Sequence, residues 1–480
     1  MHTDKILRFA FAQGSGKTIV TNPIVPERGA KTTAEQQPPG LMSESTRPLP
    51  YGVTDLLSEA GFPNGRPSVS ADNAARFGQM LVAGFGLQRR EPSHVFNDHR
   101  GYPSVRSKFP IHIYAEHVGK SWWLDPYRHA LVQVGEGTAS RIVLAGRYTH
   151  LPYFYERLRG PLVDLELGVN LRALYVALEL FGYEAALRLP DADSVRTMDR
   201  LALRPYGEWA LPLIVELDAP APSPPALSTK IELPELDPHG AAILNLVVGA
   251  NRAVLGARPV PELVAPQGIA RAVVNSGRSW AEVFFDRSSG RVPPHMAGMI
   301  ARRRRMPKTV VAELAAWLSV PPPHPVMREV ATEITTTVTL QDVDGFDTGV
   351  YRFRNGHLEH VVADPTILQQ LQTCYGVQVA TDFDNAIRNL SSVCTFSVNV
   401  PRLVDRFGPG GWTLAQYCTG WLAQGVCLSG AAHGLFARPT RAFEDLDTQS
   451  VLRLPPGELT LLSVLSGTCR FTEPMLDLRV

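Results

Sequence analysis

The sequence predicts an α+β protein built from two copies of one domain in tandem. Helical and strand-like patterns alternate without the βαβ succession of a dinucleotide-binding fold, which favours layered α+β domains. A helix that is small or apolar on nearly every face is expected at 414–435, and 155–190 resembles it. The landmarks of these helices, an aromatic residue followed by glycines thirteen and twenty-seven residues later, occur twice: Tyr155, Gly168 and Gly182, then Phe407, Gly420 and Gly434.

The segments that flank the two helices repeat in the same order. Upstream, WWLDPYRHALVQV at 122–134 resembles VYRFRNGHLEHVV at 350–362. Downstream, PYGEW at 205–209 precedes an apolar strand, as PPGEL at 455–459 does. Several matches in one order indicate an internal repeat, and two domains also suit a chain of 480 residues. We therefore expect an irregular N-terminal arm (1–45), a first domain (46–215), a Pro-rich linker (216–239) and a second domain (240–480).

Periodicity and turn residues predict the elements of each domain. The first domain is expected to have an amphipathic helix at 71–88 and strands at 111–118, 131–134 and 141–146 before its long helix. The predicted elements of the second domain are a helix at 307–318, strands at 333–340, 351–353, 357–362 and 394–400, the long helix, and a strand at 459–467.

The bulk composition argues against several classes of protein. The formal net charge of +1 gives no electrostatic basis for binding nucleic acid or an anionic membrane. No apolar run reaches the roughly 18 residues that a bilayer requires. The N-terminus lacks a signal-peptide pattern, so we expect the cytoplasm. All five cysteines lie in the second domain, at spacings that suggest neither a disulfide framework nor a zinc site.

The N-terminal arm contains a segment that imitates a phosphate-binding loop. Gly14-Ser-Gly-Lys-Thr18 has the required ending, but Phe11 stands where that loop needs its first glycine. No second nucleotide-binding motif accompanies it, and a GxGxxG pattern is absent. We therefore expect no nucleotide site in the arm.

Four segments of the second domain, within 285–470, resemble a known family. They are the Arg287-x-Ser289-x-Arg291 pattern, GVYRFRNGHLEHV at 349–361, TGWLAQGVCLSGAAHGL at 419–435 with Gln424, and ARPTRAFEDL at 437–446. Together they resemble the nitroreductase-like FMN family. More closely, they are similar to the azoline dehydrogenases of streptolysin/microcin peptide maturation, which oxidise thiazolines and oxazolines. The resemblance implies two tandem nitroreductase-like domains that form a fused pseudo-dimer.

In that family FMN lies between two copies, and each copy supplies a different motif. Here the second copy has Arg287, Ser289 and Arg291, but PPPHPVMREV stands where a Pro-Ser motif is expected. The first copy has Pro103-Ser104 and no convincing R-x-S-x-R pattern. The resemblance therefore implies one composite FMN site, with the second pseudo-symmetric site lost. The further cofactor-binding residues that it implies are Gln424, Pro439, Thr440, Arg441 and Arg470.

The residue types of this set suit the chemistry of FMN. Arg287 and Arg291 stay charged and can each donate two hydrogen bonds to the phosphate, and the Ser289 hydroxyl can donate between them. Backbone N–H groups in the Pro439–Arg441 turn can stabilise negative charge on the reduced ring. A solvated basic turn at 287–291 and an ordinary turn at Pro103-Ser104 are the alternatives.

Oxidising an azoline requires a base that takes a proton while hydride leaves to the flavin. The family carries a Lys-Tyr pair before the long helix. Those positions hold Arg406-Phe407 in the second domain and Phe154-Tyr155 in the first. Tyr155 keeps the phenol and is the candidate general acid or base, with a packed tyrosine as the alternative. Arg406 stays protonated, so it is a candidate for polarising or orienting a substrate.

The expected function is that of an FMN-dependent oxidoreductase that oxidises azolines to azoles in a ribosomally made, post-translationally modified peptide. Its expected partners are the modified precursor peptide and a cyclodehydratase complex, and a further homo-oligomer is left open. One alternative is an FMN oxidoreductase acting on another natural-product intermediate. A second alternative is a degenerate, non-catalytic scaffold subunit, because the Lys-Tyr pair is altered.

Overall fold

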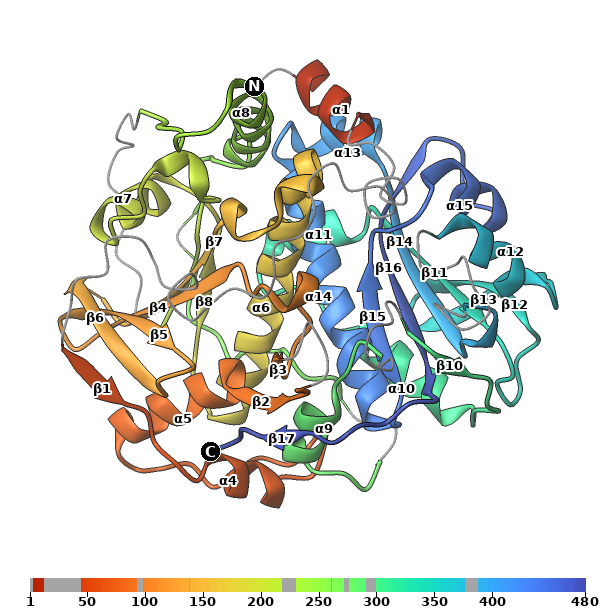
Figure 1. Cartoon of the computed structure of the whole chain (residues 1–480), viewed down its shortest axis with the longest axis horizontal. Helices are drawn as coiled ribbons and strands as arrows, with labels where there is room; N and C mark the ends of the chain where they lie inside the picture. The colour runs from red at the N-terminus through yellow and green to blue at the C-terminus, as the bar shows by residue number, and fades with distance from the viewer. Residues whose placement is uncertain are drawn as a thin grey trace.

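The computed structural model describes residues 3–12, 45–92, 98–137, 139–217, 230–259, 261–271, 276–290, 299–375 and 387–480. Two sheets lie on either side of two long helices, α6 (Arg159–Leu180) and α14 (Gly411–Ala432) (Figure 1). The predicted phosphate residue Arg291, the Gly14–Thr18 segment and much of the linker lie outside the described residues.

Each half of the chain forms one seven-stranded antiparallel sheet. The first consists of β1 (Thr46–Pro48), β4 (Ile111–His117), β5 (Lys120–Asp125), β6 (Ala130–Glu136), β7 (Arg141–Gly146), β8 (Ala186–Arg188) and β9 (Leu213–Glu216). The second consists of β10 (Ala301–Arg302), β11 (Ile334–Leu340), β12 (Gly349–Arg354), β13 (His357–Ala363), β14 (Ser392–Asn399), β15 (Phe436–Thr440) and β16 (Glu458–Cys469).

The order of neighbouring strands confirms the predicted internal repeat. The first sheet runs β1-β6-β5-β4-β7-β9-β8, and the second runs β13-β12-β11-β14-β16, with β10 and β15 both paired to β16. Strands β4, β5, β6, β7 and β9 therefore have the places of β11, β12, β13, β14 and β16. The two halves are copies of one α+β domain.

The long helices α6 and α14 form the contact between the copies, and both have 22 residues. A Cβ atom on Gly168 would clash with the carbonyl oxygen of Tyr417, and one on Gly420 would clash with that of Leu165. Tyr417 and Leu165 each lie three residues before the glycine of their own helix. Equivalent residues thus meet across the crossing, as in a two-fold symmetric dimer.

Glycines end both helices in equivalent ways. Gly182 follows α6 with a φ of 67° and Gly434 follows α14 with a φ of 69°, and this left-handed backbone suits glycine best. A glycine with left-handed backbone after the long helix is therefore a feature of both copies.

Shorter helices surround this central layer (Figure 1). Those of the first half are α1 (Thr3–Phe11), α4 (Val53–Glu59), α5 (Asn73–Phe85) and α7 (Ala192–Arg200). Those after it are α8 (Pro238–Arg252), α9 (Trp280–Asp286), α10 (Thr309–Leu318), α11 (Pro325–Ala331), α12 (Ile367–Cys374), α13 (Val400–Phe407) and α15 (Asp445–Val451). The 3-10 turns are η1 (Val105–Ser107), η2 (Tyr148–His150), η3 (Tyr153–Leu158), η4 (Tyr206–Glu208) and η6 (Ile387–Asn389).

The prediction of an irregular arm over 1–45 is wrong at its beginning, because α1 is helical. Ile6, Phe9 and Ala10 are buried, and their spacing gives this short segment one apolar face. That face packs where α1 meets α13 of the second half. The helix is therefore stabilised by a contact distant in the sequence, which a local pattern does not reveal.

The two halves also exchange other elements. Strand β17 (Leu476–Asp477), at the end of the chain, pairs with β2 (Leu87–Arg90), which in turn pairs with β3 (Asp98–Arg100). Helix α8 packs against α6 and η3. The chain is a fused pseudo-dimer with an interlocked interface, and the domain boundaries at 45/46, 215/216 and 239/240 stay a prediction.

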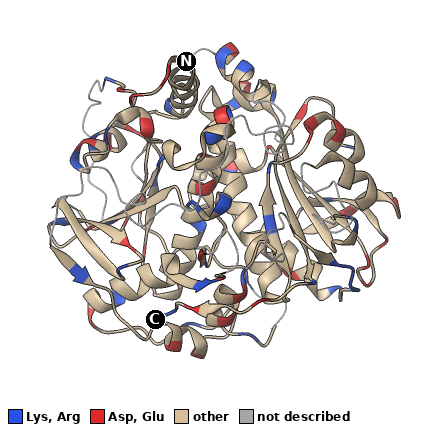
Figure 2. Cartoon of the chain, viewed as in Figure 1, with Lys and Arg blue, Asp and Glu red and all other residues tan. Residues whose placement is uncertain are grey.

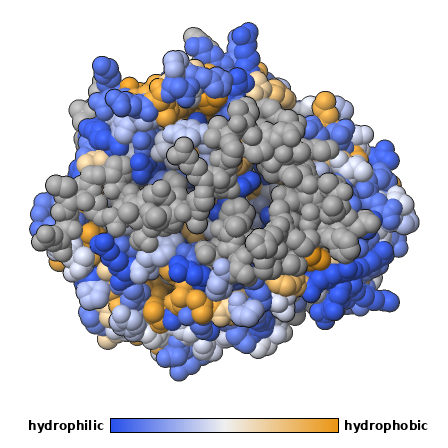
Figure 3. All heavy atoms as spheres, viewed as in Figure 1, coloured by the Kyte–Doolittle hydropathy of each residue, from blue (hydrophilic) through white to orange (hydrophobic). Residues whose placement is uncertain are grey.

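Charge and hydropathy are mixed over the surface. Basic and acidic residues alternate around the periphery in Figure 2, consistent with the formal net charge of +1. In the described part of the face in Figure 3, hydrophilic residues separate small hydrophobic patches. Within the described ranges, no helix has the length and apolar character needed to cross a bilayer. The same residues hold no His, Cys, Asp or Glu cluster suited to a metal.

Candidate functional site

Arg287 begins the site, because the end of α9 directs it toward the other half. A reciprocal cap between Ser279 and Glu282 starts this helix, and the Arg287 N–H closes it on the carbonyl of Val283 at 3.0 Å. The Arg287 side chain is buried, and its Nε donates to the carbonyl oxygen of Arg100 at 3.2 Å. Its Nη1 donates to Ser289 Oγ at 3.3 Å. One predicted phosphate ligand thus contacts another and reaches the first half.

The loop after β3 meets α14 of the other half beside Arg287. Gln424 Nε2 donates to the carbonyl oxygen of Gly101 at 3.0 Å, while Gln424 Oε1 is buried without a hydrogen-bond partner among the described residues. A Cβ atom on Gly101 would come within 3.2 Å of the Phe284 ring, so glycine permits this close approach. The interface therefore unites Arg287, Ser289 and Gln424 with the loop that contains Pro103.

A second buried arginine adds positive charge to this interface. Arg100 Nη1 donates to the hydroxyl of Tyr102 at 2.8 Å, and its guanidinium lies 4.0 Å from the centroid of the Phe109 ring. Arg100 Nε has no hydrogen-bond partner in the described part of the chain. Arg287 and Arg100 thus place two buried guanidinium groups at this interface, and guanidinium groups can donate charge-assisted hydrogen bonds to an anionic ligand.

Strand β15 links this interface to Tyr155. The Ala437 N–H donates to the carbonyl oxygen of Ser288 at 2.9 Å, which fixes β15 beside the Arg287 turn. The next residue, Arg438, interacts electrostatically with Tyr155 and Arg106 of the first half. Burial lowers the pKa of Arg438 to about 10, and the Tyr155 phenol opposes that shift.

Tyr155 is held by the loop that follows the Pro-Ser pair. Its side chain is buried, and Arg106 Nε donates to its phenolic oxygen at 3.0 Å. The Arg106 guanidinium also lies 4.9 Å from the centroid of the Phe154 ring. One phenolic oxygen thus has a guanidinium from the first half bonded to it and another from the second half nearby.

The Ser104 hydroxyl has partners inside the first half. It donates to the carboxyl oxygens of Glu166 at 2.9 and 3.0 Å, and it accepts from the Phe109 N–H at 2.9 Å. The Val105 N–H also donates to Glu166, at 2.6 Å. The sequence-based expectation that Ser104 serves the cofactor with its hydroxyl therefore competes with a structural role in the loop.

Arg406 does not lie with the other predicted residues. It is on α13 with its side chain 47% exposed, and it forms an ion pair with Glu333. Helix α14 begins at Gly411 and reaches Gln424 thirteen residues later, which corresponds to about 20 Å along its axis. The amphipathic helix α13 turns Arg406 outward, and counting residues along the chain cannot reveal that direction.

The basic residues predicted after α14 are also engaged elsewhere. Arg441 donates to the carbonyl oxygens of Thr460 and Leu461 on β16 and lies 3.9 Å from Asp445. Arg470 is exposed past the end of β16. Pro439 and Thr440 extend β15 next to Arg438 and pair with β16.

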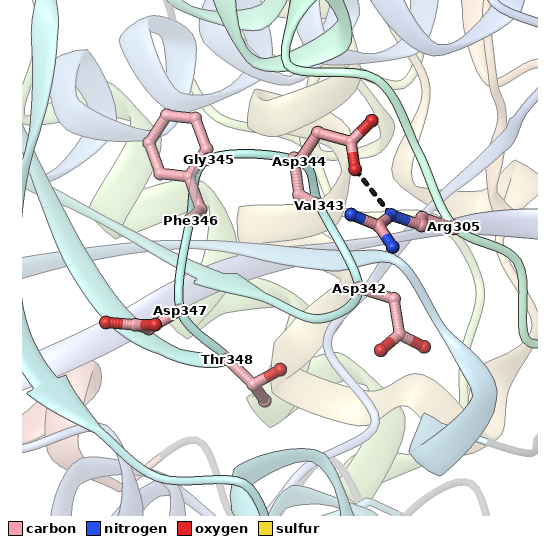
Figure 4. A pocket seen from close by; sticks show the side chains of 8 residues that line it. All are labelled: Arg305, Asp342, Val343, Asp344, Gly345, Phe346, Asp347 and Thr348. Atoms are coloured by element: carbon pink, nitrogen blue, oxygen red, sulfur yellow. Dashed lines mark hydrogen bonds and ion pairs between the residues drawn. The ribbon is translucent and has the colours of Figure 1, made fainter.

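A surface depression lies away from this interface. It has a volume of about 520 Å³ and is lined by Arg305 and the 342–348 turn between β11 and β12 (Figure 4). Arg305 pairs there with Asp344, and Arg303 pairs with Asp342. The exposed run 302–305 is thus solvated surface with acidic partners.

Sequence reasoning missed Arg100, Arg106, Glu166 and Arg438. Arg106 lies two residues after the Pro103-Ser104 pair, and Arg438 lies in the segment ARPTRAFEDL at 437–446. Their partners are distant in the sequence, so no local spacing distinguishes them from surface arginines. The polar groups that the interface does bring together fit an anionic planar cofactor. Arg287 and Ser289 can donate to an anion, Arg100 Nε can donate to a polar edge, and the Gln424 oxygen, which has no partner among the described residues, can accept from one.

No protein-family model matches the sequence, and no curated protein matches it significantly. Among solved structures, the chain is similar over 97% of its length to a protein from Anabaena variabilis described as a nitroreductase, 99% of which is covered (TM-score 0.64, 13% identity). This likeness shows the fold: the chain has the nitroreductase fold in two tandem copies, which confirms the predicted fold class.

Other solved structures match a smaller part of the chain. One is to the Escherichia coli microcin synthetase McbBCD complex with truncated pro-MccB17 bound, over 36% of this chain and 67% of that chain (TM-score 0.30, 16% identity). Another is to a Ralstonia eutropha protein described as a nitroreductase, over 38% of this chain and 90% of that chain (TM-score 0.27, 16% identity).

Proposed function

We propose that this protein is an FMN-dependent oxidoreductase that converts azolines to azoles in a ribosomally made, modified peptide. The observation that supports it most is the phenolic oxygen of Tyr155, which is bonded to Arg106 and interacts electrostatically with Arg438 of the other half. Strand β15, which contains Arg438, is bonded to the Arg287 turn. The sequence resemblance supplies the substrate class. The nitroreductase fold agrees with flavin chemistry.

In this proposal, residues from both halves bind the cofactor. Arg287 donates to the FMN phosphate, and Ser289 adds a hydroxyl to the same anion. Gln424 and the backbone around Gly101 and Pro103 provide polar contacts for the ring. Arg291 stays a predicted second phosphate ligand, outside the described residues. When bound, the flavin supplies a two-electron acceptor.

Tyr155 is the proposed proton acceptor. Aromatising an azoline removes one hydrogen as hydride and one as a proton, so the product is the azole and the acceptor gains two electrons. Tyr155 Oη takes the proton as a phenolate, and the charges of Arg106 and Arg438 stabilise that oxygen as an anion. Arg406 has no part in this step, because its side chain pairs with Glu333 at the surface.

The proposed partners follow from the substrate. A modified precursor peptide must reach the interface, and a cyclodehydratase must supply the azolines by closing Cys, Ser or Thr side chains onto the backbone. A second candidate, an FMN oxidoreductase acting on another natural-product intermediate, is favoured by the altered Lys-Tyr pair. Oxygen is the proposed electron acceptor that regenerates the flavin.

The first test is the absorption spectrum of the full-length protein, followed by heat release and identification of the cofactor. One FMN per chain with a band at about 450 nm would support the composite site. Two FMN per chain would contradict it, and none after reconstitution with excess FMN would favour a scaffold.

The second test measures turnover of a thiazoline-containing peptide by the parent protein and by the Tyr155→Phe variant. We expect kcat to fall by about 10²- to 10⁴-fold with FMN retained. Unchanged turnover would remove Tyr155 from the mechanism.

A further inference from the structure

The loop from Ser104 to Phe109 has a backbone that needs external support. Arg106, Ser107 and Phe109 have φ angles of 49°, 51° and 46°, in the left-handed region that side chains other than glycine disfavour. Three such residues within four positions persist only where surrounding contacts hold them. The support therefore has to come from groups that bond this loop.

Glu166 is the group that bonds it. The carboxyl accepts from the Ser104 hydroxyl and the Val105 N–H, and Ser104 Oγ in turn accepts from the Phe109 N–H. One carboxyl on the central helix α6 thus holds both ends of the loop. Glu166 is 4% exposed, so water does not replace these bonds.

Between these ends the loop presents Arg106 to the Tyr155 phenol at 3.0 Å. We propose that Glu166 is a positioning residue, which holds the strained loop so that Arg106 keeps its guanidinium on the phenolic oxygen of Tyr155. This inference rests on the proposed function and names the residue that prepares its proton acceptor.

The repeat supports this assignment. Glu166 lies two residues before Gly168, and the equivalent residue of α14, two before Gly420, is Cys418. Cys418 is a buried thiol whose Sγ contacts the carbonyl oxygen of Met327. The first copy thus has both the phenol of Tyr155 and the carboxyl of Glu166. The second copy has Phe407 and Cys418 at these positions and therefore has neither group.

The ionisation of Glu166 changes its bonds in a defined way. Burial raises its pKa to about 8, opposed by the Val105 and Ser104 hydrogen bonds and by the charge of Arg100, while the Tyr102 hydroxyl also faces it. Below that pH the neutral acid still accepts from Val105, and the Ser104 hydroxyl can reverse to accept its proton. A glutamine at 166 can make the same pair of bonds, whereas a leucine can make neither.

The test measures the titration of the Tyr155 phenol by ultraviolet difference spectroscopy. For each variant, the spectrum of the same protein carrying Tyr155→Phe is subtracted at every pH. In flavin-free full-length protein, Glu166→Leu should raise the midpoint by about one pH unit, because Arg106 withdraws from the phenol. Glu166→Gln should stay within about 0.3 unit of the parent. Glu179→Gln on the same helix, a residue paired with Arg66 and Arg271, is the matched control and should cause no shift.

A double variant separates positioning from general damage to the fold. Arg106→Leu should cause the same shift as Glu166→Leu, and combining the two should add nothing, because both remove one interaction. Additive shifts, or an unshifted Tyr155 in folded Glu166→Leu protein, would overturn the proposal. If Glu166→Leu does not fold, Ser104→Ala replaces it, with a smaller shift of the same sign expected and no shift counting against the proposal. These titrations use flavin-free protein, so they test the role of Glu166 even if the protein does not oxidise azolines.

Discussion

The two long helices form two pseudo-symmetric interfaces, which differ in the residues at equivalent positions. The first interface contains Gln424, and the second contains Arg172. Gln424 lies four residues after Gly420, and Arg172 lies four residues after Gly168. Gln424 bonds one carbonyl and leaves its own oxygen without a partner among the described residues. Arg172 is fully buried and donates to the carbonyl oxygens of Gly268, Trp317 and Trp421.

The aromatic residues around Arg172 complete the filling of the second interface. Its guanidinium lies 5.1 Å from the Trp317 ring centroid and 5.2 Å from that of Trp421, and Phe62 stacks on Trp317 at 5.5 Å. Burial lowers the pKa of Arg172 to about 9. In this pseudo-symmetric fold, the first interface therefore has polar groups that can bind a ligand. The second interface is filled by Arg172, which is bonded to three carbonyl oxygens. This asymmetry favours one cofactor per chain.

The largest effect is expected from a substitution that makes the interface at Gln424 resemble the one at Arg172. Gln424→Arg would fill the space beside Arg287 with a longer side chain, as Arg172 does at the other interface, so we expect FMN affinity to fall by more than about 100-fold. Titration of the flavin-free protein with FMN, followed by flavin fluorescence, measures the dissociation constant. Gln424→Ala keeps the space and removes one amide, and a loss of only about tenfold is expected. Equal losses of FMN affinity in the two variants would show that the bulk of the arginine side chain is not the cause.

Removing the phosphate ligand should have the next largest effect. Arg287→Ala deletes charge-assisted hydrogen bonds to the FMN phosphate, each worth about 1.5–3 kcal/mol, so the affinity should fall by about 100-fold. Riboflavin, which lacks the phosphate, should bind the variant and the parent nearly equally. Arg470→Ala is the control, because this exposed side chain lies past β16. An equal loss of riboflavin binding would mean that Arg287 supports the fold of the interface rather than the phosphate.

Emptying the second interface should affect stability rather than cofactor content. Arg172→Gln loses two of three carbonyl contacts and the stacking on two tryptophans, which should lower the free energy of unfolding by about 2 kcal/mol. Urea denaturation measures this change, with the exposed Arg271→Gln as the control. The FMN content should stay at one per chain, since the sequence of the first copy has no convincing R-x-S-x-R pattern. A rise toward two would show that Arg172 alone blocks a second site.

The repeat was predictable from the sequence because its landmarks are spacing constraints. The crossing of α6 and α14 requires a glycine at one position of each helix, and the left-handed stop requires another, so Gly168 and Gly182 recur as Gly420 and Gly434. Strand order then follows from the fold. Such intervals survive where most other residues have changed.

Side-chain direction was not predictable in the same way. Ser104 was expected at the cofactor, yet its hydroxyl bonds Glu166, a partner sixty-two residues away. Arg441 was expected at the cofactor, yet its guanidinium bonds β16, while Arg438 on β15, three residues earlier, interacts with Tyr155. The choice between neighbouring arginines depends on strand pairing, which no local pattern contains.

The smallest expected effect concerns Arg406, which stands in the second domain at the position of the family's lysine. Its side chain is half exposed and pairs with Glu333 on the outer face of α13, so Arg406→Gln should change kcat and KM by less than about twofold. The loss of this exposed pair should change the free energy of unfolding by about 0.5 kcal/mol or less. Steady-state kinetics on an azoline peptide would check this, with Tyr155→Phe measured beside it. If Arg406→Gln lost more than about tenfold in kcat while keeping its FMN, α13 would have to turn inward during turnover. The second half would then contribute a residue to proton transfer besides Arg438, and the division of roles between the halves would need revision.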